Sequence, residues 1–139
     1  MTTQQDRDAQ IIAEFRANGG RVGGRFADRP LLLLHTIGAK SGIERTTPVA
    51  CLPDGDRWLI FASKAGAPVS PGWYHNLVAH PDVTIEVGTA TIPARAVVLT
   101  GEERDRLYAK QAALVPVFAE YQAKTTRRIP VVALHRRDG

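Results

Sequence analysis

The sequence predicts an α+β domain whose mainly antiparallel sheet can close as a small barrel. Three observations support this fold class. Apolar runs between residues 30 and 99 are separated by short turns, which is typical of hairpins. No helix regularly separates one predicted strand from the next, so the rhythm of a parallel βαβ sheet is absent. Helical patterns occur at the start of the chain, once between the hairpins, and as a pair near the end.

The first half of the chain predicts a helix, a buried strand and a hairpin. Apolar residues recur at helical spacing up to Phe15, and "NGG" from Asn18 ends that helix. The apolar run between Pro30 and Gly38 is short enough to be a buried strand. Residues 46–63 then predict two strands joined by the turn-forming letters "PDGD".

The second half predicts a short helix, a second hairpin, a helical pair and a last strand. Ser70 and Pro71 fit the N-cap and the first residue of the short helix. Residues 82–99 alternate apolar and polar positions around a glycine, as a hairpin does. Thr100, followed three residues later by glutamate, predicts a capping box, and Pro116 should divide the helical region in two. The segment "IPVVALH" predicts the final strand.

Composition supports one domain of ordinary globular type. The chain has 139 residues and no internal repeat or linker-like tract, so a single domain over 1–139 is expected, with an N-terminal helix within 1–20. The N-terminus lacks the pattern of a signal peptide, and no apolar run approaches roughly 18 residues. The single Cys51 cannot form an internal disulfide. These features predict a cytoplasmic protein without a transmembrane segment.

A basic segment, "HTIGAKSGIERTTPV", lies between two predicted strands. It is not a phosphate-binding P-loop, because Leu34 occupies the position of the required first glycine and no helix follows. Its glycines nevertheless allow backbone N–H groups to turn inward, and Lys40, Ser41 and Arg45 add donors for an anion. The alternative interpretation is a solvated turn with ordinary surface cations.

A second segment, "FASKAGAPVSPGWYHN", also has features of an anion site. Ser63 and Lys64 end an apolar strand, and the small residues Ala65 and Gly66 allow the backbone to approach a flat ligand. The predicted helix start adds free N–H groups and the positive end of a helix dipole. Trp73 could equally be a core anchor.

No pattern points to a metal centre or a protein nucleophile. The spacings of the four histidines match no helical metal pair or Cys/His site. No G-x-S-x-G elbow occurs, and Cys51 has no activating neighbour. If the chain is an enzyme, an imported cofactor would carry the reaction.

Six motifs together resemble the deazaflavin-dependent nitroreductase family. They are "EFRANGGRVGG", "LLLLHTIGAKSGIERTTPV", "LPDGDRW", "ASKAGAP", "WYHNLVAHPDVTIEVG" and "TTRRIPVVAL", in that order, within residues 14–134. The resemblance implies a split β-barrel similar to that of FMN-binding oxidoreductases. It also implies binding of coenzyme F420, an 8-hydroxy-5-deazaflavin with a phosphodiester and a polyglutamate tail.

The resemblance implies roles for residues in both basic segments. Lys40, Ser41 and Arg45 match family positions that engage the phosphate or the acidic tail, and Lys64 is a further cation on the facing segment. The other predicted cofactor-binding residues line the ring, or the backbone and helix beside it: Thr46, Thr47, Pro48, Ser63, Ala65, Gly66, Trp73 and Asn76. Ala65 departs from the family pattern, in which glycine is usual, and His35 stands where threonine is expected.

The implied reaction is hydride transfer from C5 of the reduced coenzyme to an electron-poor small molecule. Activated alkenes, nitroaromatics and quinones are the acceptor classes that the resemblance suggests. The catalytic candidate is Tyr121 as proton donor, although solvent could supply the proton and Tyr121 could instead pack between helix and sheet.

Two other functions remain open from the sequence. One is an FMN-dependent oxidoreductase on the same barrel, and the other is a non-catalytic deazaflavin carrier. Nucleic acid is not an expected partner despite the net charge of +4, because the cations concentrate beside loops without a clear aromatic ladder. Contact with an anionic membrane should be weak, because acidic residues offset Arg7 and Arg16. Related barrels often pair, so a homodimer is expected by resemblance.

Overall fold

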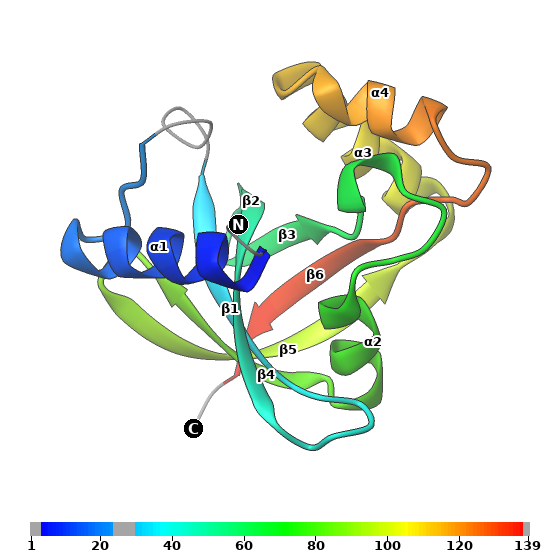
Figure 1. The fold of residues 1–139 in the computed structure, drawn as a ribbon. Coiled ribbons are helices and arrows are strands. Elements are labelled where there is room, and N and C mark those ends of the chain that lie inside the picture. Colours follow the sequence, from blue (N-terminus) through cyan, green and yellow to red (C-terminus); the bar gives the residue numbers. More distant parts are fainter. Residues whose placement is uncertain (1–3, 24–29, 138–139) are drawn as a thin grey trace.

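The computed structural model describes residues 4–23 and 30–137, which form a closed barrel flanked by helices (Figure 1). The strand order around the barrel is β1-β2-β3-β6-β5-β4, and every neighbouring pair is antiparallel. The strands are Leu31–Ile37 (β1), Glu44–Asp54 (β2), Arg57–Phe61 (β3), Asp82–Val87 (β4), Ala90–Leu99 (β5) and Val131–Arg136 (β6). The helices are Gln4–Ala17 (α1), Gly72–Ala79 (α2), Gly101–Leu114 (α3) and Val117–Ala123 (α4), with a 3-10 turn at Lys64–Gly66. The predicted antiparallel barrel is confirmed.

The surroundings of strand β1 explain why its sequence is continuously apolar rather than alternating. Leu32 and Leu34 belong to the cluster that fills the barrel. Leu31 and Leu33, on the opposite face, pack with Phe15 of α1. Because α1 covers the outer face of this strand, both faces are buried and both require apolar side chains.

Helix α1 is also held to the barrel by charge. Arg16 donates two hydrogen bonds to Glu86 of β4, with Nε–Oε1 at 3.1 Å and Nη2–Oε2 at 2.7 Å. His35 lies 2.6 Å from the same carboxylate through Nε2. The Arg16 guanidinium lowers the pKa of Glu86 below its ordinary value, and His35 adds to that effect.

None of the helices in the described part of the chain has the length and apolar character needed to span a membrane.

A second apolar core lies outside the barrel, under α3 and α4. Phe61 of β3 packs edge-on against Tyr108 and Phe118, with ring centroids 5.9 Å and 5.6 Å away. The Tyr108 hydroxyl donates to the backbone oxygen of Phe118 at 2.7 Å, and burial raises the pKa of Tyr108 to about 12. The predicted break at Pro116 is confirmed, because α3 ends at Leu114 and α4 begins after the proline. This core fixes α4 over the end of β3.

Helix α2 begins one residue later than predicted. Its first residue is Gly72 and its N-cap is Pro71, without a side-chain capping bond. The predicted cap by Ser70 is therefore wrong. The Ser70 hydroxyl instead accepts a hydrogen bond from Arg127 Nη1 at 3.3 Å, so a residue distant in sequence competes for it.

Helix α3 starts where predicted but lacks the predicted capping box. Thr100 is its N-cap, yet the threonine side chain makes no capping hydrogen bond. The Glu103 carboxylate lies 3.4 Å from the Arg57 guanidinium of β3. This pairing draws the glutamate towards the barrel instead of back to the helix start.

Candidate functional site

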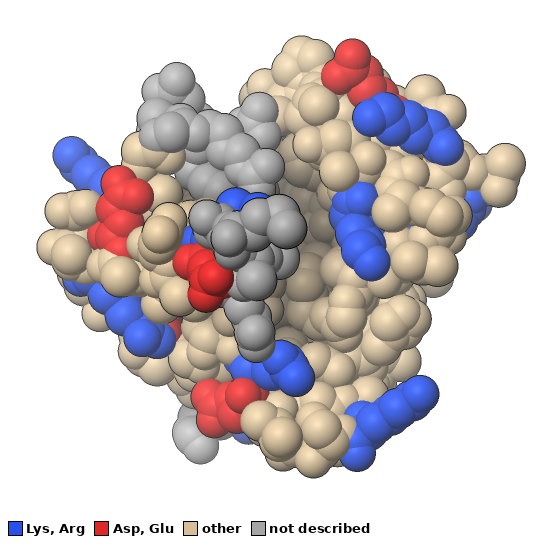
Figure 2. Space-filling view, in the orientation of Figure 1, with Lys and Arg blue, Asp and Glu red and all other residues tan. Residues whose placement is uncertain are grey.

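The cavity that contains the most predicted site residues, termed the main cavity, has a volume of about 370 Å³. It opens between β2, the end of β3, the start of α2 and α4. Figure 2 shows a hollow on this face, with Lys and Arg side chains at several points around it. Six predicted site residues from four separate segments line the cavity: Pro48, Ser63, Lys64, Ala65, Trp73 and Tyr121. The fold therefore brings together residues that the sequence places up to 73 positions apart.

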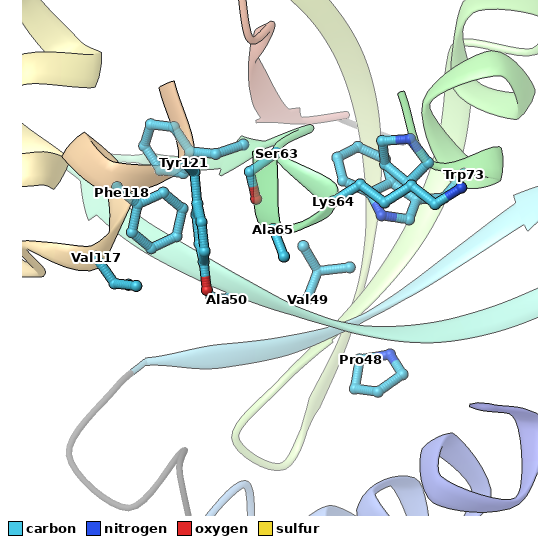
Figure 3. Close-up of a pocket in the computed structure, with 12 residues that line it drawn as sticks. Pro48, Val49, Ala50, Ser63, Lys64, Ala65, Trp73, Val117, Phe118 and Tyr121 are labelled. Atoms are coloured by element: carbon cyan, nitrogen blue, oxygen red, sulfur yellow. The ribbon is translucent and has the colours of Figure 1, made fainter. Parts of the chain in front are cut away.

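One wall of the main cavity is apolar and comes from α4. Val117, Phe118 and Tyr121 form this wall, across from Lys64 and Trp73 (Figure 3). The Phe118 and Tyr121 rings meet edge to face, with centroids 5.3 Å apart. Within the described residues, the Tyr121 hydroxyl has no hydrogen-bond partner, so its O–H remains available to a ligand in the cavity.

The turn that borders the cavity has an unusual backbone. Lys64 and Ala65 have positive φ values of 46° and 54°, which side chains disfavour. Gly66 follows with φ 83°, and a Cβ there would stand 2.8 Å from the backbone oxygen of Tyr121 and 3.0 Å from Lys124 Cβ. Gly66 is thus needed where the turn packs against α4. Gly66 does not line the main cavity, whereas Lys64 and Ala65 before it do.

Arg127 holds this turn in place. Its Nη2 donates to the backbone oxygens of Ala62 at 3.1 Å and Ser63 at 2.9 Å. Its Nε donates to the Ala67 oxygen at 2.9 Å, and Nη1 reaches the Ser70 hydroxyl. Burial lowers the pKa of Arg127, and no carboxylate in the described residues pairs with it. Sequence reasoning missed this residue, because backbone acceptors leave no side-chain signature.

A second hollow, the cationic depression, lies between the loop 38–45 and the start of α2. Its volume is about 550 Å³, and Lys40, Ser41 and Arg45 line it together as the sequence predicted. The three residues are exposed. Gly42, with φ 70°, closes the turn by donating to the Gly38 oxygen at 2.9 Å. Two basic side chains and a hydroxyl at one end of α2 favour an anionic ligand.

Asn76 of α2 fixes the position of that loop. Its Oδ1 accepts a hydrogen bond from the Ala39 N–H at 2.9 Å, and its Nδ2 donates to the buried Thr36 hydroxyl at 3.2 Å. The amide is therefore already used by the protein. Asn76 lines the cationic depression rather than the main cavity.

Two predicted site residues lie elsewhere. Thr46 and Thr47 line a depression of about 450 Å³ between β2 and α1, which Arg45 also borders. The Thr46 hydroxyl is 3.1 Å from His35 Nδ1, on the strand face that α1 covers. Neither threonine lines the main cavity, and their contact with a ring stays a prediction.

Cys51 is not placed for chemistry. It is buried in the barrel core, and burial raises the pKa of its thiol to about 12. Among residues 4–23 and 30–137, no group of three His, Cys, Asp or Glu side chains could hold a metal ion.

Comparisons with known proteins agree on one family. A family profile described as F420H(2)-dependent quinone reductase matches residues 9–136. An F420H(2)-dependent quinone reductase of Mycobacterium tuberculosis is 45% identical over 131 residues, covering 90% of this chain and 87% of the relative. The structure of an F420H2-dependent reductase superposes with a TM-score of 0.70 and 38% identity, covering 81% of this chain and 100% of that one. A structure described as a domain-swapped dimer has a TM-score of 0.72 and 34% identity, covering 96% and 100%.

Proposed function

The chain belongs to the F420H(2)-dependent quinone reductase family, and from this premise we propose that it reduces a quinone with hydride from coenzyme F420. The observation that carries the proposal is the pairing of a cavity with an apolar wall and a separate cationic depression on either side of the start of α2. This arrangement matches a coenzyme with a flat ring at one end and an acidic tail at the other.

The residues present fit that coenzyme. We propose that Lys40, Ser41 and Arg45 hold the phosphate and acidic tail, since they converge on the cationic depression and are exposed to a ligand. Trp73 and the backbone of Ser63 and neighbouring residues would line the ring in the main cavity. When bound, the coenzyme supplies hydride from C5 of its deazaflavin ring.

The chain's own part in the reaction is to orient the reactants, exclude water and manage one proton. A quinone that accepts a hydride must also gain a proton to become a hydroquinone. We propose that the Tyr121 hydroxyl donates this proton, because it borders the main cavity and is not used elsewhere in the described residues. Val117 and Phe118 beside it form an apolar surface suited to the quinone ring.

The same site could serve other hydride acceptors. Nitroaromatics and activated alkenes are also flat and electron-poor, and nothing in an apolar wall selects strongly against them. We propose quinones as the main class because the family is named for them. Relative turnover of a quinone, a nitroaromatic and an activated alkene at equal concentrations tests this order.

Cofactor choice is tested by equilibrium binding of F420 and FMN. We expect F420 to bind more tightly, and the double change Lys40→Ala with Arg45→Ala to weaken it by roughly 10- to 100-fold. The double change Arg106→Ala with Lys110→Ala is the matched control, because it removes the same charge from exposed positions of α3. Equal or tighter binding of FMN would overturn the choice of F420.

A non-catalytic carrier would bind F420 equally well, so turnover must be measured separately. We expect the wild-type protein to oxidise F420H2 when menadione is added. Binding without turnover across a panel of quinones, nitroaromatics and alkenes would favour the carrier.

We also propose that the protein acts as a homodimer in the cytoplasm. A similar structure is described as a domain-swapped dimer, and the single cysteine is buried and unpaired, as a reducing compartment permits. Light scattering after size-exclusion chromatography should give twice the mass of the chain. A mass equal to one chain at micromolar concentration would contradict the dimer.

A further inference from the structure

The hydrogen bonds of Arg127 show how two peptide groups beside the main cavity are oriented. The backbone oxygens of Ala62 and Ser63 both accept hydrogen bonds from its Nη2. A trans peptide is planar, with its N–H pointing opposite to its C=O, and no described peptide bond is cis. The N–H groups of Ser63 and Lys64, which belong to those two peptides, therefore point away from the guanidinium.

The two residues that carry these N–H groups both line the main cavity. Arg127, on the other side of these peptide groups, is not among the lining residues. In the described part of the chain, neither N–H has a hydrogen-bond partner, although the N–H groups of Ala62 and Gly66 on either side do. Two adjacent backbone donors beside the cavity are therefore left without a partner in the described part of the chain.

The backbone conformation of this turn is unfavourable on its own and needs support from surrounding residues. Lys64 and Ala65 both have positive φ, and such non-glycine residues persist only where the surroundings fix them. Arg127 supplies the constraint through Ala62, Ser63 and the Ala67 oxygen together. Because no carboxylate in the described residues pairs with Arg127, these backbone oxygens are the main compensation for burying its charge.

We propose that Arg127 is a positioning residue, which holds the N–H groups of Ser63 and Lys64 towards the main cavity as a paired donor site. The acceptor would be a carbonyl oxygen at the edge of the coenzyme's ring system. This inference rests on the proposed function, since that function puts the ring in the main cavity. Arg127 acts through the turn and does not touch the reacting atoms.

The first test uses the free protein and needs no coenzyme. Amide NMR relaxation of Ser63 and Lys64 should show lower order in Arg127→Ala than in the wild type. Arg128→Ala is the matched control, because Arg128 is the exposed neighbour and its Nε pairs with Asp105 at 3.1 Å. Arg127→Lys keeps the charge but lacks the planar fork, so it should resemble Arg127→Ala and provides a second variant if that one folds poorly.

The second test adds oxidised F420. In the wild type, the amide protons of Ser63 and Lys64 should move downfield on binding. Arg127→Ala should bind roughly 10-fold more weakly, and methylguanidinium in the buffer should restore part of the affinity, whereas Arg128→Ala should bind normally. Recovery by a free guanidinium distinguishes positioning from a general loss of stability.

The outcomes separate this inference from the proposed function. If the wild type binds F420 but the two amide protons do not move, the donor site is wrong while the function stands. If Arg127→Ala binds as tightly as Arg128→Ala, the positioning role is wrong. If the wild type binds no F420, the proposed function fails, and unchanged order of the turn in free Arg127→Ala would still overturn the role of Arg127.

Discussion

The loop 38–45 and the turn 62–70 both border the candidate site, but they are built in opposite ways. In the first, Gly42 supplies the positive φ and the functional groups are exposed side chains. In the second, Lys64 and Ala65 carry positive φ without being glycine, and Arg127 holds the backbone from behind. The difference suggests that the first loop acts through side-chain charge and the second through backbone direction.

The largest expected effect compares one glycine from each loop. Gly66→Ala should lower the free energy of unfolding by about 2–4 kcal/mol, because strain at positive φ adds to a collision with α4. Gly42→Ala should lower it by only about 1 kcal/mol, since nothing lies within 4 Å of the added Cβ. Urea unfolding of both variants measures the difference. Equal losses would mean that the second loop is not tightly packed.

The next effect concerns the attachment of the first loop. Asn76→Ala removes the hydrogen bonds to the Ala39 N–H and the Thr36 hydroxyl. We expect a loss of about 1–2 kcal/mol in stability and roughly 3- to 10-fold weaker F420 binding, because Lys40 would then be presented by a looser loop. His80→Ala, just beyond the same helix and exposed, is the control. Unchanged F420 affinity in Asn76→Ala would show that the loop orders itself.

Ala65→Gly tests whether the backbone of the second loop is strained, because strain decides whether the change raises or lowers the free energy of unfolding. Glycine tolerates φ of 54° without strain, so the variant should be stabilised by about 0.5–1 kcal/mol despite the greater freedom of its unfolded chain. At an ordinary negative φ, the same change would destabilise by a similar amount. Thermal and urea unfolding distinguish the two signs directly.

The smallest expected effect is on stability and concerns the Arg16–Glu86 ion pair, which lies outside both loops. It gives a reference value against which the effects of changes in the two loops can be compared. Because Arg16 lowers the pKa of Glu86 in the folded protein, the resulting stability is present above the ordinary glutamate pKa of 4.5 and is lost as the pH falls through the lower, folded-state value. Arg16→Met should reduce this acid-dependent part by a few tenths of a kcal/mol, since the pair is partly exposed.

The comparison of stability at pH 7 and pH 3 measures that contribution. F420 binding at pH 7 should not change in Arg16→Met, because no described residue of α1 lines the main cavity or the cationic depression. Weaker binding in this variant would mean that α1 supports the site as well as the barrel.

The sequence predicted the barrel and the break at Pro116 because hairpin turns and a proline inside a helical region are local features. It also predicted that Lys40, Ser41 and Arg45 lie together, since one short glycine-flanked segment carries all three. It did not predict Arg127, whose acceptors are backbone oxygens 60 to 65 positions away in the chain and the Ser70 hydroxyl, 57 positions away.

The errors have the same cause. The cap predicted for Ser70 failed because Arg127 takes the hydroxyl, and the capping box failed because Glu103 pairs with Arg57. In each case the side chain expected to cap a helix instead contacts an arginine that is distant in the sequence. Local spacing cannot reveal such a partner, so tertiary contacts decided where the sequence reasoning went wrong.

The most direct test of the account is anaerobic mixing of the protein with F420H2 deuterated or unlabelled at C5, followed by a quinone. We predict quinone-dependent oxidation of the coenzyme, with a primary isotope effect in a single turnover and loss of rate in the Lys40→Ala, Arg45→Ala double variant at limiting coenzyme. Tight binding of F420H2 without quinone-dependent oxidation would contradict the assignment of this chain as a reductase.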